Sequence, residues 1–261
     1  MNKQRRNTLM AIGAVGMGFV AVRFVPTLIP QKLEMEAMSD LQGFRKLNAG
    51  KSSAGSFDFF VGLDAEEDRL QKDAKLKADT RVLKNICGAL YEGLDLKSGQ
   101  VPMASFSDYY CPYCRVQTKR LAKLVETKGD EIAVAWHELP LLGENSDLAA
   151  KAALAAKRQG TYAAFHRRLM KSAFSVSPEY LSQLVKDLNI NESQFLADMA
   201  SDEVRIELEN SAALSRAFAF VGTPALVIGR TVIQGQISDR VIERIVELER
   251  EEGWAEQCGY A

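Results

Sequence analysis

The stretch VPMASFSDYYCPYCRVQTKRLAKLVETKG, residues 101–129, decides the fold. Its first ten residues are mostly apolar and end in a polar turn, which predicts a short buried strand. From Cys111 onward the pattern is helical, and Pro112 suits the first turn of a helix because its missing N–H is not needed there. A second apolar run, 131–142, predicts another strand. Strand, helix and strand in this order predict the start of a βαβ unit with a parallel sheet.

The rest of this domain is predicted to be interrupted by helices. Between residues 144 and 219, one capping residue after another precedes a helical pattern, which predicts an inserted all-helical domain. The chain returns to strands in VGTPALVIGRTVIQG, residues 221–235, where the glycine-first pair Gly229-Arg230 predicts the turn of a β-hairpin. The fold class that we expect is therefore α/β, with one domain formed by two halves around a helical insertion.

The first thirty residues have the layout of an export signal. Lys3, Arg5 and Arg6 precede an apolar run without charges, 8–22. No small-x-small cleavage site follows, so we predict an uncleaved membrane anchor within 8–30, with a removed signal peptide as the alternative. A twin-arginine signal and a buried N-terminal helix are weaker interpretations. An anchor would keep the basic residues in the cytoplasm and place the rest of the chain across the membrane.

Composition argues against several classes of function. The chain has 261 residues, 47% hydrophobic and 26% charged, which is ordinary for a globular protein. A formal net charge of −1 gives no basic excess for nucleic acid, and two histidines argue against a histidine-rich metal centre.

The expected parts are an anchor or signal (1–30), a linker and N-terminal extension (31–98) with a flexible stretch at 48–56, the first α/β half (99–143), the helical insertion (144–219), and the second half with the tail (220–261).

Cys111 and Cys114 are the candidate redox pair. Unpaired backbone N–H groups and the helix dipole stabilise a thiolate at the N-terminus of a helix, and Cys111 has that position. Cys114 follows one turn later, close enough to form a disulfide with it. Cys111 would be the nucleophile in disulfide exchange, and Cys114 would resolve the mixed disulfide.

Other uses of the cysteines are weaker. A zinc site would need Cys87 and Cys258 as further ligands, and both are isolated in the sequence. A purely structural bridge within CPYC would close too short a loop to contribute much entropy, and a protease dyad of Cys111 with His137 is disfavoured because His137 lies in a strand-like run. We predict instead that Cys87 and Cys258 form a structural disulfide between the extension and the tail, with two buried free thiols as the alternative.

Pro224 begins a strand after a turn, which makes the Thr223–Pro224 bond a candidate for the cis form. A cis bond would expose backbone groups that can pair with an extended substrate chain. An ordinary trans proline at a strand edge is the alternative.

Three stretches in this order, FSDYYCPYCRVQ, ELPLLGENSDLAAKAALAAKRQGTYAAFHRRLM and GTPALVIG, resemble the DsbA family of thiol–disulfide oxidoreductases over residues 99–250. The resemblance implies a thioredoxin fold with a helical insertion, a redox pair Cys111 and Cys114 around the dipeptide Pro112-Tyr113, and a cis-proline loop at Thr223-Pro224. Some members carry a buried acid six residues before the first cysteine. Ser105 stands there in this chain, and the nearest acid, Asp108, is three residues before Cys111.

The function that we expect is disulfide exchange with cysteines of exported proteins, preferably oxidation of substrate thiols. The expected location is the bacterial periplasm or cell envelope, tethered to the inner membrane. No cofactor and no metal are expected, and a membrane or soluble redox partner would recycle the pair. The alternatives are a reductase or isomerase of the same fold, a glutaredoxin-like enzyme, and a redox-inert binding or assembly module, which would keep its function after Cys111→Ser.

Overall fold

A computed structural model describes residues 33–48, 51–53, 67–172 and 175–258 of the chain. The unit from Met35 to Ala261 is compact and contains nearly all of the described residues. The predicted anchor or signal, 1–30, lies outside them. Within the part of the chain that the structure describes, no helix has both the length and the apolar character needed to cross a membrane.

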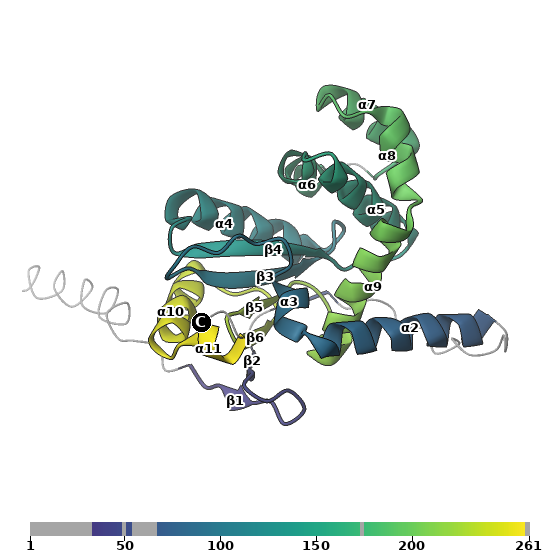
Figure 1. Cartoon of the computed structure of the whole chain (residues 1–261). Coiled ribbons are helices and arrows are strands. Elements are labelled where there is room, and N and C mark those ends of the chain that lie inside the picture. The colour runs from purple at the N-terminus through teal and green to yellow at the C-terminus, as the bar shows by residue number, and fades with distance from the viewer. Residues whose placement is uncertain (1–32, 49–50, 54–66, 173–174, 259–261) are drawn as a thin grey trace, which may run out of the picture. The chain divides into compact units, whose positions relative to one another are not determined.

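The centre of this unit is a mixed sheet with the strand order β1-β2-β6-β5-β3-β4 (Figure 1). Its strands are β1 (Glu36–Ala37), β2 (Arg45–Asn48), β3 (Val101–Ser107), β4 (Ile132–Glu138), β5 (Ala225–Ile228) and β6 (Thr231–Gln234). β3 and β4 are parallel, as the predicted strand–helix–strand unit requires, and β5 pairs antiparallel to both β3 and β6. The turn between β5 and β6 is Gly229-Arg230, where Gly229 has a φ of 55°.

The sheet extends beyond the two predicted α/β halves. β2, from the segment 31–98, pairs parallel to β6, and β1 pairs antiparallel to β2. Leu47 of β2 is buried, and Phe44 just before it packs edge-on against Phe218. Part of the predicted extension is therefore built into the same sheet as the candidate redox site.

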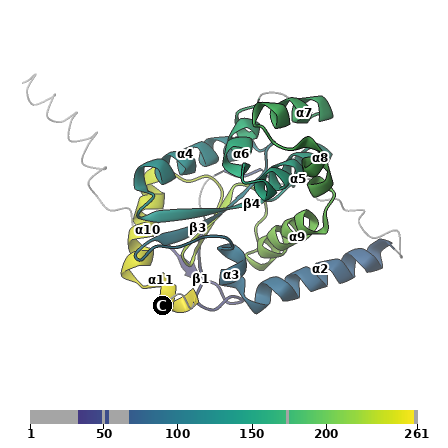
Figure 2. The ribbon, with the colours of Figure 1, turned by 45° about the horizontal axis from the view of Figure 1, so that its top comes forward.

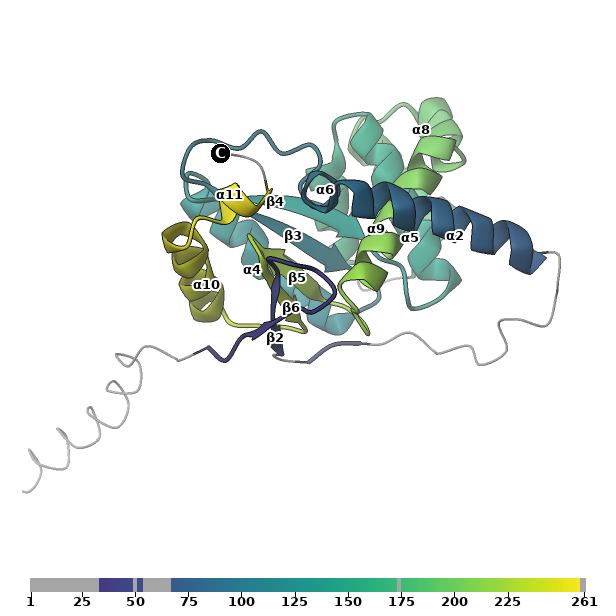
Figure 3. The same cartoon turned by 60° about the horizontal axis from the view of Figure 1, so that its bottom comes forward.

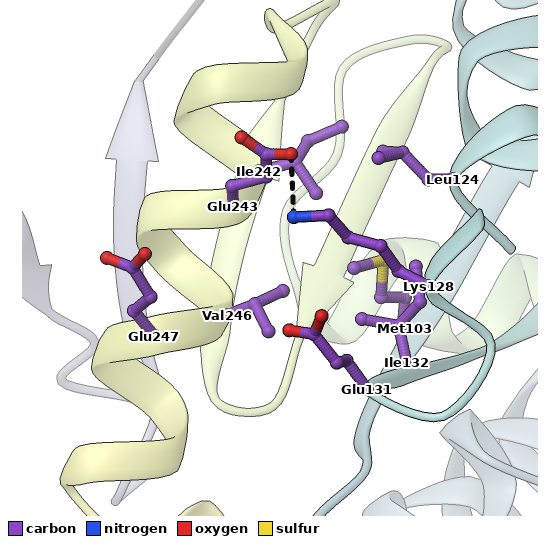
Figure 4. Close-up of a pocket in the computed structure, with 9 residues that line it drawn as sticks. All are labelled: Met103, Leu124, Lys128, Glu131, Ile132, Ile242, Glu243, Val246 and Glu247. Carbon is purple, nitrogen blue, oxygen red and sulfur yellow. Dashed lines mark ion pairs between the residues drawn. The ribbon is translucent and has the colours of Figure 1, made fainter.

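Helices cover both faces of the sheet. α4 (Pro112–Lys128) connects β3 to β4, and α10 (Asp239–Glu251) follows the hairpin. Both pack on one face, where Leu124 and Ile242 line the same cleft (Figure 4). On the other face the buried side chains of β3, such as Phe106, pack in one cluster with Leu90 and Leu214.

The described residues between β4 and β5 form the helices of the predicted insertion: α5 (Glu144–Arg158), α6 (Tyr162–Lys171), α7 (Pro178–Asp187), α8 (Glu192–Met199) and α9 (Asp202–Ala217). Figure 2 shows them gathered on one side of the unit. Ser177, Asn191 and Ser201 cap α7, α8 and α9 by accepting a hydrogen bond from a backbone N–H. Apolar residues of α5, α6, α7 and α8 form a core that also contains both cysteines of the CPYC stretch.

The remaining helices flank this framework. α2 (Glu67–Lys84) runs along α9 (Figure 3), with Ala78 and Val82 buried and an ion pair between Asp79 and Arg216. α3 (Ile86–Leu90) and α11 (Trp254–Cys258) are joined by a disulfide between Cys87 and Cys258. The disulfide therefore connects the N-terminal part of the unit to its last helix.

Candidate active site

The two cysteines of the CPYC stretch lie at the start of α4. Cys111 is the N-cap residue, and its sulfur accepts a hydrogen bond from the backbone N–H of Cys114 at 3.2 Å. Both are free thiols without exposed surface. Of the dipeptide between them, Pro112 is exposed at the first helical position, and Tyr113 is half-buried against the core of the helical insertion.

The loop before Cys111 is held by the buried carboxylate of Asp108. One oxygen accepts hydrogen bonds from Tyr110 N–H and Ser146 Oγ, both at 2.8 Å. The other accepts from the N–H groups of Leu141 and Leu142, at 2.7 and 3.0 Å. This one side chain thus ties the end of β3 to the loop after β4 and to the first turn of α5.

The second strand–turn element of the site is the Thr223–Pro224 loop. The peptide bond is cis, and β5 begins at the next residue. The thiol of Cys111 donates to the carbonyl oxygen of Thr223 at 3.2 Å. The structure therefore brings together Cys111, Cys114 and the Thr223–Pro224 loop, although about 110 residues separate the two stretches.

The pKa values of the two thiols move in opposite directions. A hydrogen bond from the Cys114 thiol is the largest cause that lowers the pKa of Cys111, to about 6. Burial opposes this, while the side chains of Thr223 and Ser53 and the Cys114 N–H lower the pKa further. Burial raises the pKa of Cys114 far above its ordinary value, and the neighbouring Cys111 adds to the rise. The arrangement suits one nucleophilic thiolate beside one protonated thiol.

Ser53 belongs to this site, and sequence reasoning missed it. The stretch 48–56 was expected to be flexible; of it, the structure describes Asn48 at the end of β2 and residues 51–53. Ser53 forms an isolated antiparallel bridge with Thr223. No pattern in the stretch NAGKSSAGS indicated this contact. The Ser53–Thr223 bridge depends on the position of β2 in the sheet, since β2 directly precedes this stretch.

A buried polar cluster beside the loop was also missed. Glu138, at the end of β4, accepts hydrogen bonds at 2.6 Å from the hydroxyls of Tyr109 and Tyr162, and His166 lies 3.4 Å from the same carboxylate. All four come from elements predicted by the sequence, but their convergence requires α6 to pack on the end of β4. Ser105, where some relatives have an acid, is buried in the middle of β3.

The remaining candidates lie elsewhere. Nε2 of His137 is 2.8 Å from the Leu90 carbonyl oxygen and its ring stacks on Phe106; burial lowers its pKa to about 4. Cys87 and Cys258 form their own disulfide. Among the described residues, no group of three or more His, Cys, Asp or Glu side chains is placed to hold a metal ion.

A cleft between α4 and α10 is separate from the cysteines. It is lined by the apolar side chains of Met103, Leu124 and Ile132, and an ion pair of 2.9 Å between Lys128 and Glu243 crosses it (Figure 4). Lys128 is the last residue of α4, whereas Cys111 caps its first turn. The cleft therefore contributes nothing to the chemistry of the thiols.

Solved structures similar to this chain include proteins described as thioredoxin-like. A thioredoxin-like oxidoreductase from Silicibacter pomeroyi DSS-3 is 31% identical with a TM-score of 0.59, covering 63% of this chain and 97% of that one. The catalytic domain of Proteus mirabilis ScsC is 28% identical with a TM-score of 0.56, covering 66% and 98%. A periplasmic thioredoxin-like protein from Salmonella enterica serovar Typhimurium is 25% identical with a TM-score of 0.55, covering 64% and 97%.

Among curated proteins, a Na(+)/H(+) antiporter NhaA of Herminiimonas arsenicoxydans is 23% identical over 154 residues. The match covers 59% of this chain and spans a quarter of the length of that relative, 25%. The family model of the DSBA-like thioredoxin domain matches residues 103–246, which is more than half of the chain and includes the cysteine pair and the cis-proline loop. The chain therefore belongs to the family of DsbA-like thiol–disulfide oxidoreductases.

Proposed function

We propose that this protein oxidises thiols of exported proteins through a Cys111–Cys114 disulfide. A substrate thiolate attacks the Cys111 sulfur, the Cys111–Cys114 bond breaks, and Cys114 takes up a proton. A second substrate thiolate then attacks the substrate sulfur of the mixed disulfide and releases Cys111 as a thiolate. The substrate has lost two electrons and two protons, and the redox pair has gained two electrons.

The lowered pKa of Cys111 is the observation that favours oxidation of substrate thiols over reduction of substrate disulfides. A thiolate of low pKa is a good leaving group, and stabilising the reduced form of a redox pair makes the pair more oxidising. With a pKa of about 6, Cys111 is mostly ionised at neutral pH. The raised pKa of Cys114 supports the same assignment, because the resolving thiol stays protonated and donates to the Cys111 sulfur.

Export is the second part of the proposal. It is supported by the cations and the apolar run in 1–30 and by the description of the Salmonella neighbour as periplasmic. If 8–30 stays uncleaved, the domain is tethered to the inner membrane. Protease added to spheroplasts would then digest the domain while leaving cytoplasmic markers intact; protection from the protease would refute export.

The decisive measurement is the equilibrium of the pair with glutathione, with the Cys111 pKa read from thiolate absorbance. We expect a potential clearly above the ~−270 mV of thioredoxin and a slope against pH that changes from ~−59 to ~−30 mV per unit near the Cys111 pKa. A potential at or below that of thioredoxin, with a Cys111 pKa near ~8.5, would reject the oxidase.

Activity is checked on a reduced, unfolded model substrate supplied with oxidised glutathione. Cys111→Ser should abolish its oxidation, whereas Cys87→Ser with Cys258→Ser should retain it, since these two cysteines lie outside the site. A Cys111→Ser protein with full biological function would favour a redox-inert module instead.

A further inference from the structure

A short piece of the chain's own N-terminal part occupies the exposed backbone of the cis-proline loop. Ser53 N–H donates to the Thr223 carbonyl oxygen at 2.7 Å, and Thr223 N–H donates to the Ser53 carbonyl oxygen at 2.9 Å. Gln236 N–H adds a third bond, to the Lys51 carbonyl oxygen at 2.9 Å. The backbone groups of Thr223 that could pair with another extended chain are therefore already paired.

The side chain of Ser53 also acts on the thiol, because it is one of the groups that lower the pKa of Cys111. Ser53 is directly opposite Thr223, whose carbonyl oxygen accepts from the same thiol, so the residue at position 53 lies beside the loop that contacts the Cys111 sulfur. Cysteine and serine differ only in sulfur against oxygen, so a substrate cysteine would fit the same place.

Cys111 has no exposed surface in this arrangement. Disulfide exchange needs a sulfur atom to approach Cys111 directly. Some contact that covers the thiol must open before a protein substrate can react. The Ser53–Thr223 bridge is the suitable one, because it is isolated from the named strands, whereas Cys114 and the Thr223 loop are fixed by α4 and β5.

We propose that Lys51–Ser53 is an internal occupant of the substrate-binding edge, the backbone of Thr223 in the cis-proline loop. An extended substrate segment displaces it by pairing with Thr223 and places its own cysteine where Ser53 was. This rests on the proposed function and deepens it. The preferred substrate is an extended, unfolded segment, since it must add to Thr223 by backbone hydrogen bonds. Folded proteins whose cysteines lie in helices are disfavoured, and the occupant slows reaction with every substrate that it excludes.

The competition is tested by the alkylation rate of Cys111 in the reduced full-length protein, measured as a function of pH. Ser53→Pro removes the N–H that donates to Thr223, so the limiting rate of the thiolate should rise roughly two- to tenfold, the factor that one backbone hydrogen bond represents. Ser53→Ala keeps both backbone bonds and removes the hydroxyl. It should raise the Cys111 pKa and increase the limiting rate less than Ser53→Pro does.

An unchanged or lower limiting rate in Ser53→Pro would overturn the proposal and make the segment part of the catalytic framework. Alkylation does not depend on the direction of electron flow. A faster alkylation rate in Ser53→Pro together with a reducing potential would therefore reject the proposal that the protein is an oxidase. It would retain the proposal that Lys51–Ser53 occupies the substrate-binding edge.

A second measurement tests the position of residue 53 without weakening the segment. Ser53→Cys is combined with Cys114→Ser, and oxidised glutathione takes two electrons and two protons from the two thiols to give a Cys111 disulfide and two glutathione molecules. Mass spectrometry should detect peptides linked between positions 53 and 111. Ser52→Cys is the matched control, because successive side chains of an extended segment point to opposite sides. No link at position 53, or an equal yield from position 52, would refute the proposed placement.

Discussion

At the scale of single residues, the site depends on groups that never meet the substrate. Asp108 is the clearest case, because its carboxylate accepts four hydrogen bonds within the buried loop before Cys111. Asp108 is not among the largest causes of the lowered pKa of Cys111. Its geometry therefore assigns it to positioning the loop, a role that the spacing of three residues before the cysteine could not distinguish from proton transfer.

Asp108→Asn should destabilise the protein while leaving the Cys111 pKa nearly unchanged. The amide of asparagine keeps one acceptor oxygen and replaces the other with an NH₂ group. That NH₂ group would face either the N–H groups of Leu141 and Leu142 or the donors of Tyr110 and Ser146, and both pairs of donors need an acceptor. We expect a loss of about 2–4 kcal/mol in the free energy of unfolding, measured in urea. Ser146→Ala, which removes one of the four bonds, should cost about 1 kcal/mol. A Cys111 pKa moved by a full unit in Asp108→Asn would instead indicate an electrostatic role for Asp108.

At the scale of elements, regular patterns could be predicted and short or polar segments could not. β3, α4 and β4 carry seven or more residues each with clear periodicity, so their order and the parallel pairing could be inferred. β2 is the tetrapeptide RKLN and has too few apolar residues to indicate a strand. It is held by partners more than 180 residues away, which no local pattern can reveal.

The partner that holds β2 is Glu249 of α10, a fully buried acid. Its carboxylate accepts from Arg45 Nη2 at 2.7 Å, from Thr231 Oγ1 at 2.6 Å and from Arg230 N–H at 2.9 Å. It therefore connects β2, the β5–β6 turn and α10. Because β2 precedes Lys51–Ser53 along the chain, the same acid helps to place the segment that covers Cys111.

Glu249→Gln should cost roughly 3 kcal/mol, since it removes the charge of the fully buried one of the two carboxylates, Glu249 and Glu252, that compensate Arg45 and Arg230. Urea unfolding measures the change. The matched control is Asp130→Asn at the Lys97–Asp130 pair, whose side chains are 71% and 96% exposed. That change should cost below about 1 kcal/mol. Equal effects of the two substitutions would contradict the connecting role of Glu249.

At the scale of the whole molecule, the site exists only because distant segments meet. The sequence predicted the cysteine pair, since its helix position is local, and the cis-proline candidate, since proline at a strand start is local too. It did not predict that Ser53 would pair with Thr223, or that Glu138, Tyr109 and His166 would cluster behind the loop. These contacts follow from the packing of β2 on β6 and of α6 on β4, which single-sequence patterns do not specify.

The lowered pKa of Cys111 also links the global stability of the reduced protein to pH. In the folded protein this pKa is about 6, below the ~8.5 of an unfolded chain. Between these values the unfolded state binds more protons at Cys111, so the folded state gains stability as pH rises, by at most about 1.4 kcal/mol per pH unit. This gain is lost as pH falls through about 6. Cys114 contributes nothing below ~8.5, because its raised pKa keeps it protonated in both states.

Comparison with Cys111→Ser isolates this effect, because serine does not titrate in this range. His137, with its pKa lowered to about 4, and all other groups titrate in both proteins and cancel in the difference. Unfolding of the two proteins in urea under reducing conditions, from pH 5 to pH 8, should give a stability difference that is flat at the acid end. It should then grow in favour of the protein with Cys111 as pH rises above about 6. A difference independent of pH would mean that folding does not stabilise the thiolate, and the argument for an oxidising pair would fall with it.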